Sequence, residues 1–262
     1  MHFDLSTGVA GLLVGAIVGV TGVGGGALMT PILVLLFGVA PTTAVGTDLL
    51  YASITKMFGT AVHQKHGTID WQIVHRLAIG SLPAAALTLA WMHFSGAGHI
   101  KDGVIIFTLG LALTITSLGI LFKEQIHGLG TRLRLGDSVR FKAMQPGLTV
   151  FAGVLLGVMV TLTSVGAGAL GTAMLVYLYP LRLSAGKLVG TDLAHAIPLT
   201  LIAGLGHLTL GNVDLALMLN LLAGSIPGVI AGSLVSARAP VKIVRIAIAL
   251  VLLFVAFKMM VH

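Results

Sequence analysis

Apolar residues form ten runs along the chain, separated by short polar stretches, and this pattern predicts a helical membrane protein. The runs lie at about residues 8–22, 27–40, 44–62, 73–94, 103–122, 147–164, 168–180, 188–206, 215–236 and 241–261. A bilayer core needs roughly 20 helical residues to cross it, and backbone groups in lipid find no water to bond, so we expect every run to be helical. The second and seventh runs reach only about 21 Å at 1.5 Å per residue.

Composition supports the same class. Hydrophobic residues make up 56% of the 262 positions and charged residues only 9%, against roughly 25% in a soluble domain. This excludes an ordinary soluble enzyme and a disordered chain. The net charge of +7 comes from short loops between apolar runs, which indicates membrane topology and not a nucleic-acid partner. The chain has no cysteine, so disulfides and thiolate metal sites are excluded.

The two halves of the sequence repeat each other. Residues Val23 to Leu28 resemble Val165 to Leu170, and Val45 to Leu49 are identical to Val189 to Leu193. The second match continues through further identical pairs, which are His63 and His207, Gly67 and Gly211, Asp70 and Asp214, Gly80 and Gly224, Ser81 and Ser225, and Pro83 and Pro227. We therefore expect two transmembrane repeats, residues 1–122 and 147–262, joined by a polar loop, 123–146.

The basic residues indicate how the repeats are oriented. With five segments in each half, twelve of the fifteen Lys and Arg residues fall on the connector side of the membrane, which the positive-inside rule makes cytoplasmic. An odd number of segments inverts the second half, as in many secondary transporters. The expected fold is an all-α polytopic membrane protein of two inverted repeats with 8–10 spans. The short segments either cross or form re-entrant hairpins that turn at Gly22–Gly26 and Ser164–Gly168.

Glycine-rich turns precede the two short segments and are candidate substrate sites. They are Gly24, Gly25 and Gly26 in the first half, and Gly166, Ala167 and Gly168 in the second. A helix start offers unpaired N–H groups and partial positive charge, and glycine lets a ligand approach the backbone closely. Such a turn suits an anion. The alternative is that these glycines only allow tight helix packing.

Each half also carries a Gly-Thr-Asp motif about two turns into an apolar run. Thr47 and Thr191 are candidate substrate ligands, and Asp48 and Asp192 are candidate proton carriers. An ionisable group at that depth is costly unless it is paired or faces water. The carboxylates could instead brace the glycine turns or satisfy the start of their own helices.

Two further ionisable residues lie inside apolar runs. Lys56 follows Asp48 by eight residues and is a candidate for attracting the anion, although it could also snorkel to the interface. His195 lies one helical turn after Asp192 and could join a proton path, or simply pack. No metal site and no cofactor is expected.

Other polar and small residues favour structural roles. The glycine series Gly11, Gly15, Gly19 and Gly224, Gly228, Gly232 predicts close helix packing. His63, His207, Asp70 and Asp214 lie at segment ends, where caps and turns are favoured over metal binding. The glycine-rich segments are also compatible with a homodimer.

At these residues the chain resembles the TauE/SafE family of sulfite exporters. The resemblance covers nearly the whole chain. It rests on the first glycine turn through Met29-Thr30-Pro31, on Ala44 to Asp48, on His63 to Trp71 and on Gly80 to Pro83, with their second-half copies. It implies movement of sulfite or a related sulfonate or organosulfur anion across the bacterial inner membrane, driven by protons or membrane potential. Family members often carry a small polar residue such as serine at the Asp48 and Asp192 positions, so this chain departs from them there.

Alternating access between the two glycine turns is the mechanism this sequence favours, with the anion near the midplane. Two other classes stay open. A passive anion channel would use the same turns as a filter, and a cation or metal carrier would use Asp48, Asp192 and His195 as ligands. A membrane enzyme is disfavoured, because no nucleophile, base and orienting group occur together.

Overall fold

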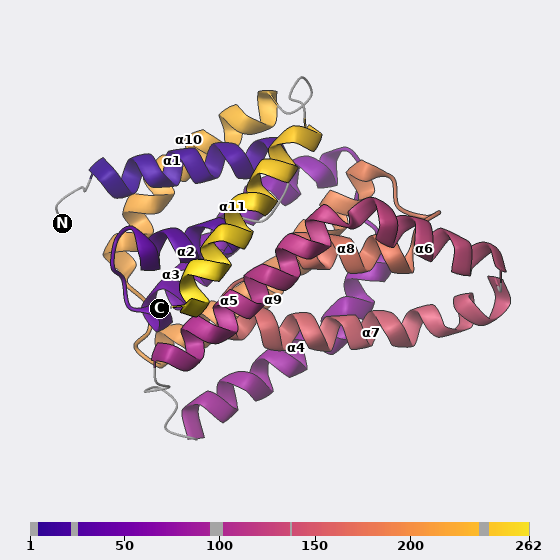
Figure 1. Cartoon of the computed structure of the whole chain (residues 1–262), viewed down its shortest axis with the longest axis horizontal. Coiled ribbons are helices and arrows are strands. Elements are labelled where there is room, and N and C mark those ends of the chain that lie inside the picture. Colours follow the sequence, from indigo (N-terminus) through magenta and orange to yellow (C-terminus); the bar gives the residue numbers. More distant parts are fainter. Residues whose placement is uncertain (1–4, 22–25, 95–101, 137, 236–240, 262) are drawn as a thin grey trace.

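Helices account for all the regular structure in the described part of the chain (Figure 1). The computed structural model describes residues 5–21, 26–94, 102–136, 138–235 and 241–261. The helices are α1 Leu5–Thr21, α2 Gly26–Leu35, α3 Pro41–Lys65, α4 Trp71–Phe94, α5 Asp102–Leu121, α6 Lys123–Gly136, α7 Ser138–Thr163, α8 Ala169–Leu178, α9 Ala185–Thr209, α10 Leu215–Val235 and α11 Val241–Val261.

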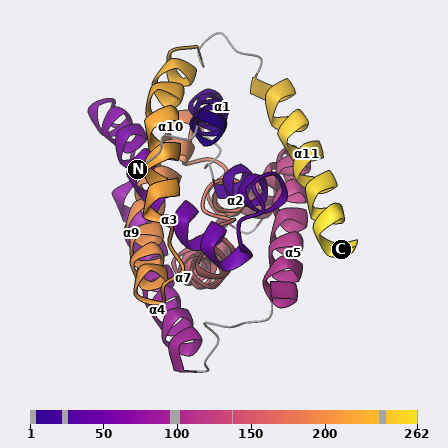
Figure 2. The ribbon, with the colours of Figure 1, turned by 90° about the vertical axis from the view of Figure 1, so that its left-hand side faces the viewer.

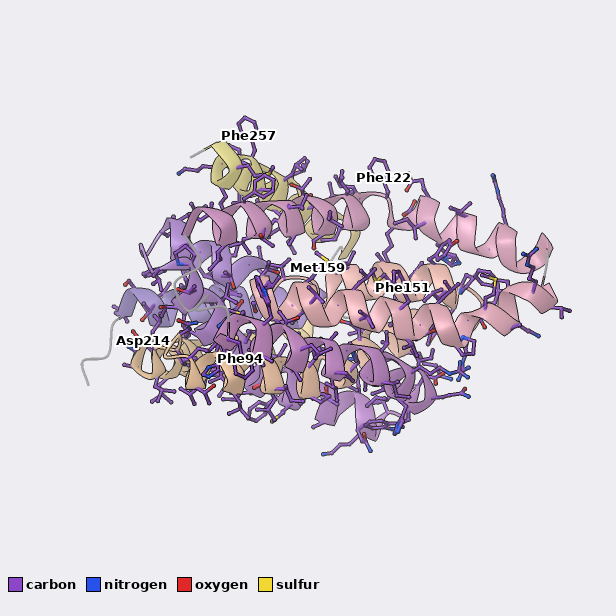
Figure 3. The ribbon with its side chains drawn as sticks, turned by 90° about the horizontal axis from the view of Figure 1, so that it is seen from below. Phe94, Phe122, Phe151, Met159, Asp214 and Phe257 are labelled. Carbon is purple, nitrogen blue, oxygen red and sulfur yellow. The ribbon has the colours of Figure 1, made fainter. Side chains whose placement is uncertain are left out.

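Several helices are long and apolar enough to cross a membrane. Within the described residues these are α4, α7, α9 and α10, and the pair α5 and α6, bent by 68°, adds a fifth if it is taken as one span. Large apolar side chains also point outward from the helices: Phe94, Phe122, Phe151 and Phe257 are all at least half exposed (Figure 3). Apolar side chains distributed over so much of the outside suit contact with lipid. The protein is an all-α, multi-pass membrane protein.

The two halves interlock. Helices α1 to α5 correspond to α7 to α11, and each half packs its first helix against the fourth helix of the other, α1 on α10 and α7 on α4 (Figure 2). At the centre, α3 and α9 run antiparallel, because Gly204 approaches Leu50 while Gly59 approaches Leu193. Equivalent helices that cross in opposite directions have the relation expected of inverted repeats.

Glycines allow these helices to touch backbone to backbone, as the sequence predicted. A Cβ atom added at Gly11 or Gly15 would collide with the α10 backbone, and one at Gly224, Gly228 or Gly232 would collide with that of α1. The second pair of helices repeats this contact, since Gly153 of α7 meets the carbonyl of Leu77 in α4. The packing prediction is confirmed at these positions, while Gly19 lies outside the residues whose packing is described.

We expect Gly153→Val to destabilise the protein strongly. Its Cβ would meet the Leu77 carbonyl oxygen and carbon, and backbone atoms cannot rotate aside, so the loss should reach about 3 kcal/mol. Gly147→Val, in the same helix but with open space around its Cβ position, is the matched control and should change stability by less than about 1 kcal/mol. Thermal unfolding in detergent compares the two, and equal melting temperatures would contradict the packing argument.

The polar segment 123–146 is largely helical and is not the loop that its polarity suggested. It contains α6 and the first nine residues of α7. Helix α6 bends away from α5 and packs on α8, where Gly130 lies against the backbone of Tyr177. Polarity hid this helix because its stability comes from a tertiary contact and not from an apolar run.

The second short helix returns along the helix before it. The Gln145 side-chain amide donates to the Leu178 carbonyl at 2.6 Å, and the hydroxyls of Thr149 and Tyr179 are 2.7 Å apart. The end of α8 therefore lies beside the first part of α7. The two helices form an antiparallel hairpin that turns at residues 164–168. Both alternatives of the sequence analysis contain such a hairpin, and its re-entrant form stays a prediction.

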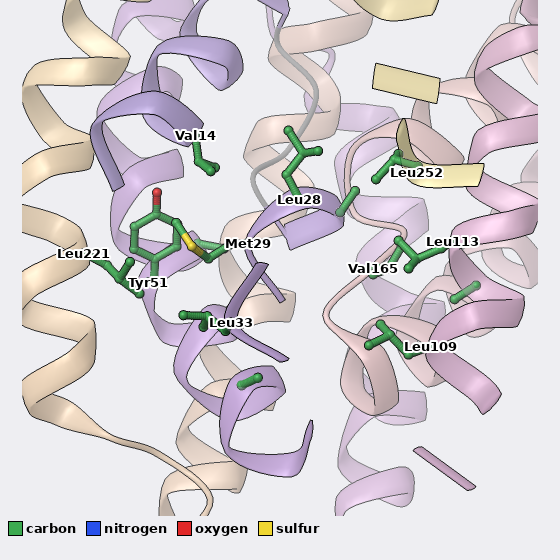
Figure 4. Packing of buried hydrophobic residues seen from close by; sticks show 14 of the residues in the cluster. Val14, Leu28, Met29, Leu33, Tyr51, Leu109, Leu113, Val165, Leu221 and Leu252 are labelled. Atoms are coloured by element: carbon green, nitrogen blue, oxygen red, sulfur yellow. The ribbon is translucent and has the colours of Figure 1, made fainter. Parts of the chain in front are cut away.

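The first short helix, α2, packs into an apolar cluster with α3 and α10. Figure 4 shows Met29 of α2 close to Tyr51 of α3 and Leu221 of α10, and all three are fully buried. Val165, in the turn before α8, joins the same cluster near Leu113 of α5. The apolar packing thus holds α2 and the second turn in the interior, next to α3.

Candidate functional site

Three charged side chains are buried together where the two halves meet. Asp48 and Lys56 come from α3 and are 0% and 4% exposed, and Asp192 comes from α9 and is 1% exposed. Lys56 interacts electrostatically with both carboxylates. It is the only lysine or arginine that is buried among the described residues. The structure therefore brings together three residues that the sequence singled out separately.

Lys56 ties α3 to the turn between α7 and α8. Its Nζ donates to the carbonyl oxygen of Ala167 at 3.0 Å. The snorkelling alternative fails here, because the ammonium group bonds inside the protein and does not reach the surface. Because this bond joins the middle of α3 to the turn, the turn lies deep within the helix bundle.

The turn itself needs glycine. Gly166 has a φ of 122° and Gly168 a φ of 145°, values that side-chain-bearing residues rarely adopt. Helix α8 begins directly afterwards, and no side chain caps its start. Uncapped N–H groups at a helix start favour an anion. Gly166, Ala167 and Gly168 thus keep the geometry that made them candidate substrate residues.

Asp48 is held by a threonine of the first short helix. Thr30 Oγ1 donates to Asp48 Oδ2 at 2.5 Å, while Oδ1 has no hydrogen-bond partner among the described residues. The Ser164 side chain, from the second half, is a further polar neighbour of this carboxylate. The sequence analysis did not identify Thr30 as a partner of Asp48. The repeat offered a signal for it, since a threonine, Thr172, occupies the equivalent position in the second half.

Asp192 is less well held than Asp48. Its Oδ1 lies against Gly171 of α8, where a Cβ would collide with it, and that oxygen has no hydrogen-bond partner among the described residues. Thr172 does not take the role of its counterpart, because its hydroxyl donates to the Ala169 carbonyl at 2.9 Å. The two carboxylates are therefore equivalent in sequence but not in environment.

His195 faces a serine of α4. Its Nε2 and the Ser81 hydroxyl are 2.8 Å apart, and no hydrogen bond joins it to Asp192. The equivalent pair is Tyr51 and Ser225, whose side chains are also neighbours across the two halves, although Ser225 Oγ has no hydrogen-bond partner among the described residues. This reciprocity favours the packing role for His195, and its place in a proton path stays a prediction.

Thr47 and Thr191 brace loops of the opposite half. Thr47 Oγ1 accepts the backbone N–H of Asp214 at 3.0 Å, and Thr191 Oγ1 accepts that of Asp70 at 3.0 Å. Neither threonine has a hydrogen bond to Lys56 or to either buried carboxylate in the described structure. Their expected role as substrate ligands is therefore unsupported by direct contacts, and stays a prediction.

Asp70 and Asp214 cap the helices that follow them, as expected. Asp70 Oδ1 accepts the N–H of Ile73 at 3.3 Å, and Asp214 Oδ1 accepts that of Leu217 at 2.9 Å. In the first glycine turn, Gly26 begins α2, whereas Gly24 and Gly25 lie outside the described residues. The described ranges contain no group of three His, Asp or Glu side chains that could hold a metal ion.

Comparisons with known proteins agree with this architecture. The family model for the sulfite exporter TauE/SafE matches residues 7–259. The probable membrane transporter protein YjnA of Bacillus subtilis is 43% identical over 236 residues, which cover 87% of this chain and 88% of that protein. The probable membrane transporter protein YdhB of the same organism is 28% identical and covers 90% of this chain and 91% of its own length.

A more distant relative is the probable membrane transporter protein MJ0441 of Methanocaldococcus jannaschii. It is 25% identical over 215 residues, which cover 79% of this chain and 72% of that protein. No solved structure matches the chain. The family match covers nearly all the helices described above, and the relatives are all named as probable membrane transporters. The chain therefore belongs to the TauE/SafE sulfite exporter family and is a multi-pass membrane transport protein.

Proposed function

We propose that the protein is a secondary transporter of a small oxyanion, sulfite or a related sulfonate or organosulfur anion, in the bacterial inner membrane. The observation that carries this proposal is the buried cluster of Lys56, Asp48 and Asp192 between the two halves. The family name supports the substrate class. The reciprocal packing of the two halves supports alternating access around that cluster.

Lys56 supplies the attraction for an anion. Only one hydrogen bond of its ammonium group, to the Ala167 carbonyl, is present among the described residues, and an ammonium group has three N–H donors. Two donors therefore stay available for an oxyanion, next to the uncapped start of α8. In an interior of low dielectric these contacts are much stronger than they are in water.

The two carboxylates supply the coupling to protons. A negative substrate beside Lys56 would be repelled by ionised Asp48 and Asp192, so its binding favours their protonated forms. Anion and proton then bind together and move in the same direction. The direction of net transport follows the substrate gradient, the proton gradient and the membrane potential.

The cluster is closed to solvent, because its three side chains are at most 4% exposed. Transport therefore requires the halves to move and to expose the cluster to one side at a time. The hydrogen bond between Lys56 and Ala167 joins α3 to the turn before α8. A substrate that takes the place of Ala167 at the ammonium group would therefore release α3 from this turn.

Sulfite uptake into sealed proteoliposomes tests this function. We expect accumulation above that of empty liposomes, with stimulation when the outside is made more acidic, because protons enter with the anion. Uptake that never exceeds equilibrium would indicate a passive channel. No uptake by correctly folded protein would exclude sulfite, and sulfonates and thiosulfate would then be tested in the same assay.

The cation carrier has less support. Its three proposed ligands do not converge, since His195 bonds to Ser81, and Lys56 places a positive charge beside both carboxylates. A cation at this position would be repelled by the ammonium group. Competition of metal ions with sulfite uptake checks this alternative, and we expect none.

A further inference from the structure

A second basic site lies away from the buried cluster, at the end of the molecule formed by the start of α4, the start of α7 and the loop after α8. An open pocket of about 370 Å³ occurs there. Its lining residues are Gln72, Arg76, Lys142, Gln145, Pro146, Tyr179, Pro180, Leu181 and Arg182. Its volume lies within the usual range for small-molecule sites, roughly 300–1,000 Å³.

The lining carries three cations and no carboxylate. Asp70, which is not part of the lining, is engaged by Arg182 through two bonds, of 2.7 Å from Nε and 2.8 Å from Nη2. Arg76 has a phenol as its hydrogen-bond partner, and Lys142 makes no hydrogen bond or ion pair with any described residue. Because Asp70 neutralises the charge of Arg182, the positive charges of Arg76 and Lys142 stay uncompensated at the pocket.

Tyr179, one of the lining residues, contacts both arginines of the pocket. Tyr179 is 2% exposed, and its hydroxyl accepts from Arg76 Nη1 at 3.2 Å and lies 2.7 Å from the Thr149 hydroxyl. The Arg182 guanidinium lies over the tyrosine ring, 5.7 Å from its centre. A buried tyrosine between two guanidinium groups fixes their positions, which lowers the cost of ordering them around a ligand.

We propose that this pocket binds the oxyanion of a phosphate or sulfate group, held by Lys142 and Arg76. Arg presents a planar fork of donors that matches such a group, and Lys adds a mobile point charge. The group belongs either to a free anion or to the headgroup of an anionic phospholipid. Leu181 and Met144, which are 63% and 50% exposed, provide apolar surface beside the pocket for acyl chains. The site does not depend on the transport function proposed above.

Trp71 reports on binding, because it precedes Gln72 of the pocket lining and is 53% exposed. The chain has two tryptophans, and a Trp91→Phe background leaves Trp71 as the single fluorophore. In uncharged detergent, free of phospholipid, we expect phosphate or sulfate to change its fluorescence saturably. Lys142→Gln should then weaken the affinity about tenfold, or about 1.4 kcal/mol. Lys187→Gln, an equal loss of charge at an exposed position outside the pocket, should leave it unchanged.

The lipid source is distinguished by native mass spectrometry after mild delipidation. If a headgroup occupies the pocket, phosphatidylglycerol stays bound to the parent and the Lys187→Gln variant but is lost from Lys142→Gln. If Lys142→Gln and Lys187→Gln weakened the anion affinity equally, the binding would depend only on the overall surface charge, and the proposal would be overturned. Absence of both saturable anion binding and retained phospholipid would also overturn it. These are equilibrium measurements without flux, so their failure and a failure of transport are distinguishable.

Discussion

We expect the Lys56→Met variant to lose sulfite uptake almost completely while staying folded. The substituted side chain has similar length and no charge, so the anion loses the only buried cation of the described residues. A fall of about 100-fold in the initial rate corresponds to about 2.7 kcal/mol at 1.36 kcal/mol per tenfold change. The measurement is the initial rate of sulfite uptake into proteoliposomes with an acidic outside.

Folding should survive this change for a physical reason. Removing one partner of a buried ion pair is costly when the other partner stays charged. Asp48 and Asp192 can each take up a proton once the ammonium group is absent, so no uncompensated charge stays buried. Lys65→Met, at the exposed end of the same helix, is the control for loss of charge. Uptake by Lys56→Met within about twofold of the parent, a difference of about 0.4 kcal/mol, would remove Lys56 from the substrate site.

We expect the Asp192→Asn variant to lose the stimulation of uptake by a proton gradient. Asparagine has the shape of the protonated carboxyl group but cannot release a proton. Asp192 Oδ1 has no hydrogen-bond partner among the described residues, so proton uptake there disrupts no bond to that oxygen. The ratio of uptake with and without an acidic outside should fall to about one, as expected when the titrating group is removed.

Asp48→Asn should keep part of that stimulation. Thr30 already donates to one oxygen of Asp48, and such a bond favours the ionised form, so this carboxylate is the poorer proton carrier of the two. Glu124→Gln, on the exposed surface of α6, is the control for loss of an acidic group. Full gradient stimulation in Asp192→Asn together with none in Asp48→Asn would reverse the assignment.

The sequence predicted which residues form the candidate site, but it did not predict the contacts that they make. Asp48, Asp192 and Lys56 stood out because charged residues are rare inside apolar runs, and the structure does bury all three together. Thr47 and Thr191 stood out equally, yet they bond to loops of the opposite half. A short polar motif does not show which of its side chains faces the centre.

The sequence by itself determined the helical membrane fold, and its repeated motifs predict a division into two repeats. Long apolar runs admit only helices in lipid, and the matching motifs placed equivalent glycines and aspartates in both halves. The glycine series also predicted close packing, because a backbone without Cβ atoms is the simplest way to bring two helices together.

Only the tertiary structure decided which elements meet. It pairs α1 with α10 and α7 with α4, and it places α8 alongside α7. It also shows that the polar segment 123–146 contains the helix α6, which packs against α8. It also gives Asp48 a threonine partner and leaves Asp192 beside Gly171. These outcomes depend on contacts between residues far apart in the chain, and local composition and periodicity carry no information about such distances.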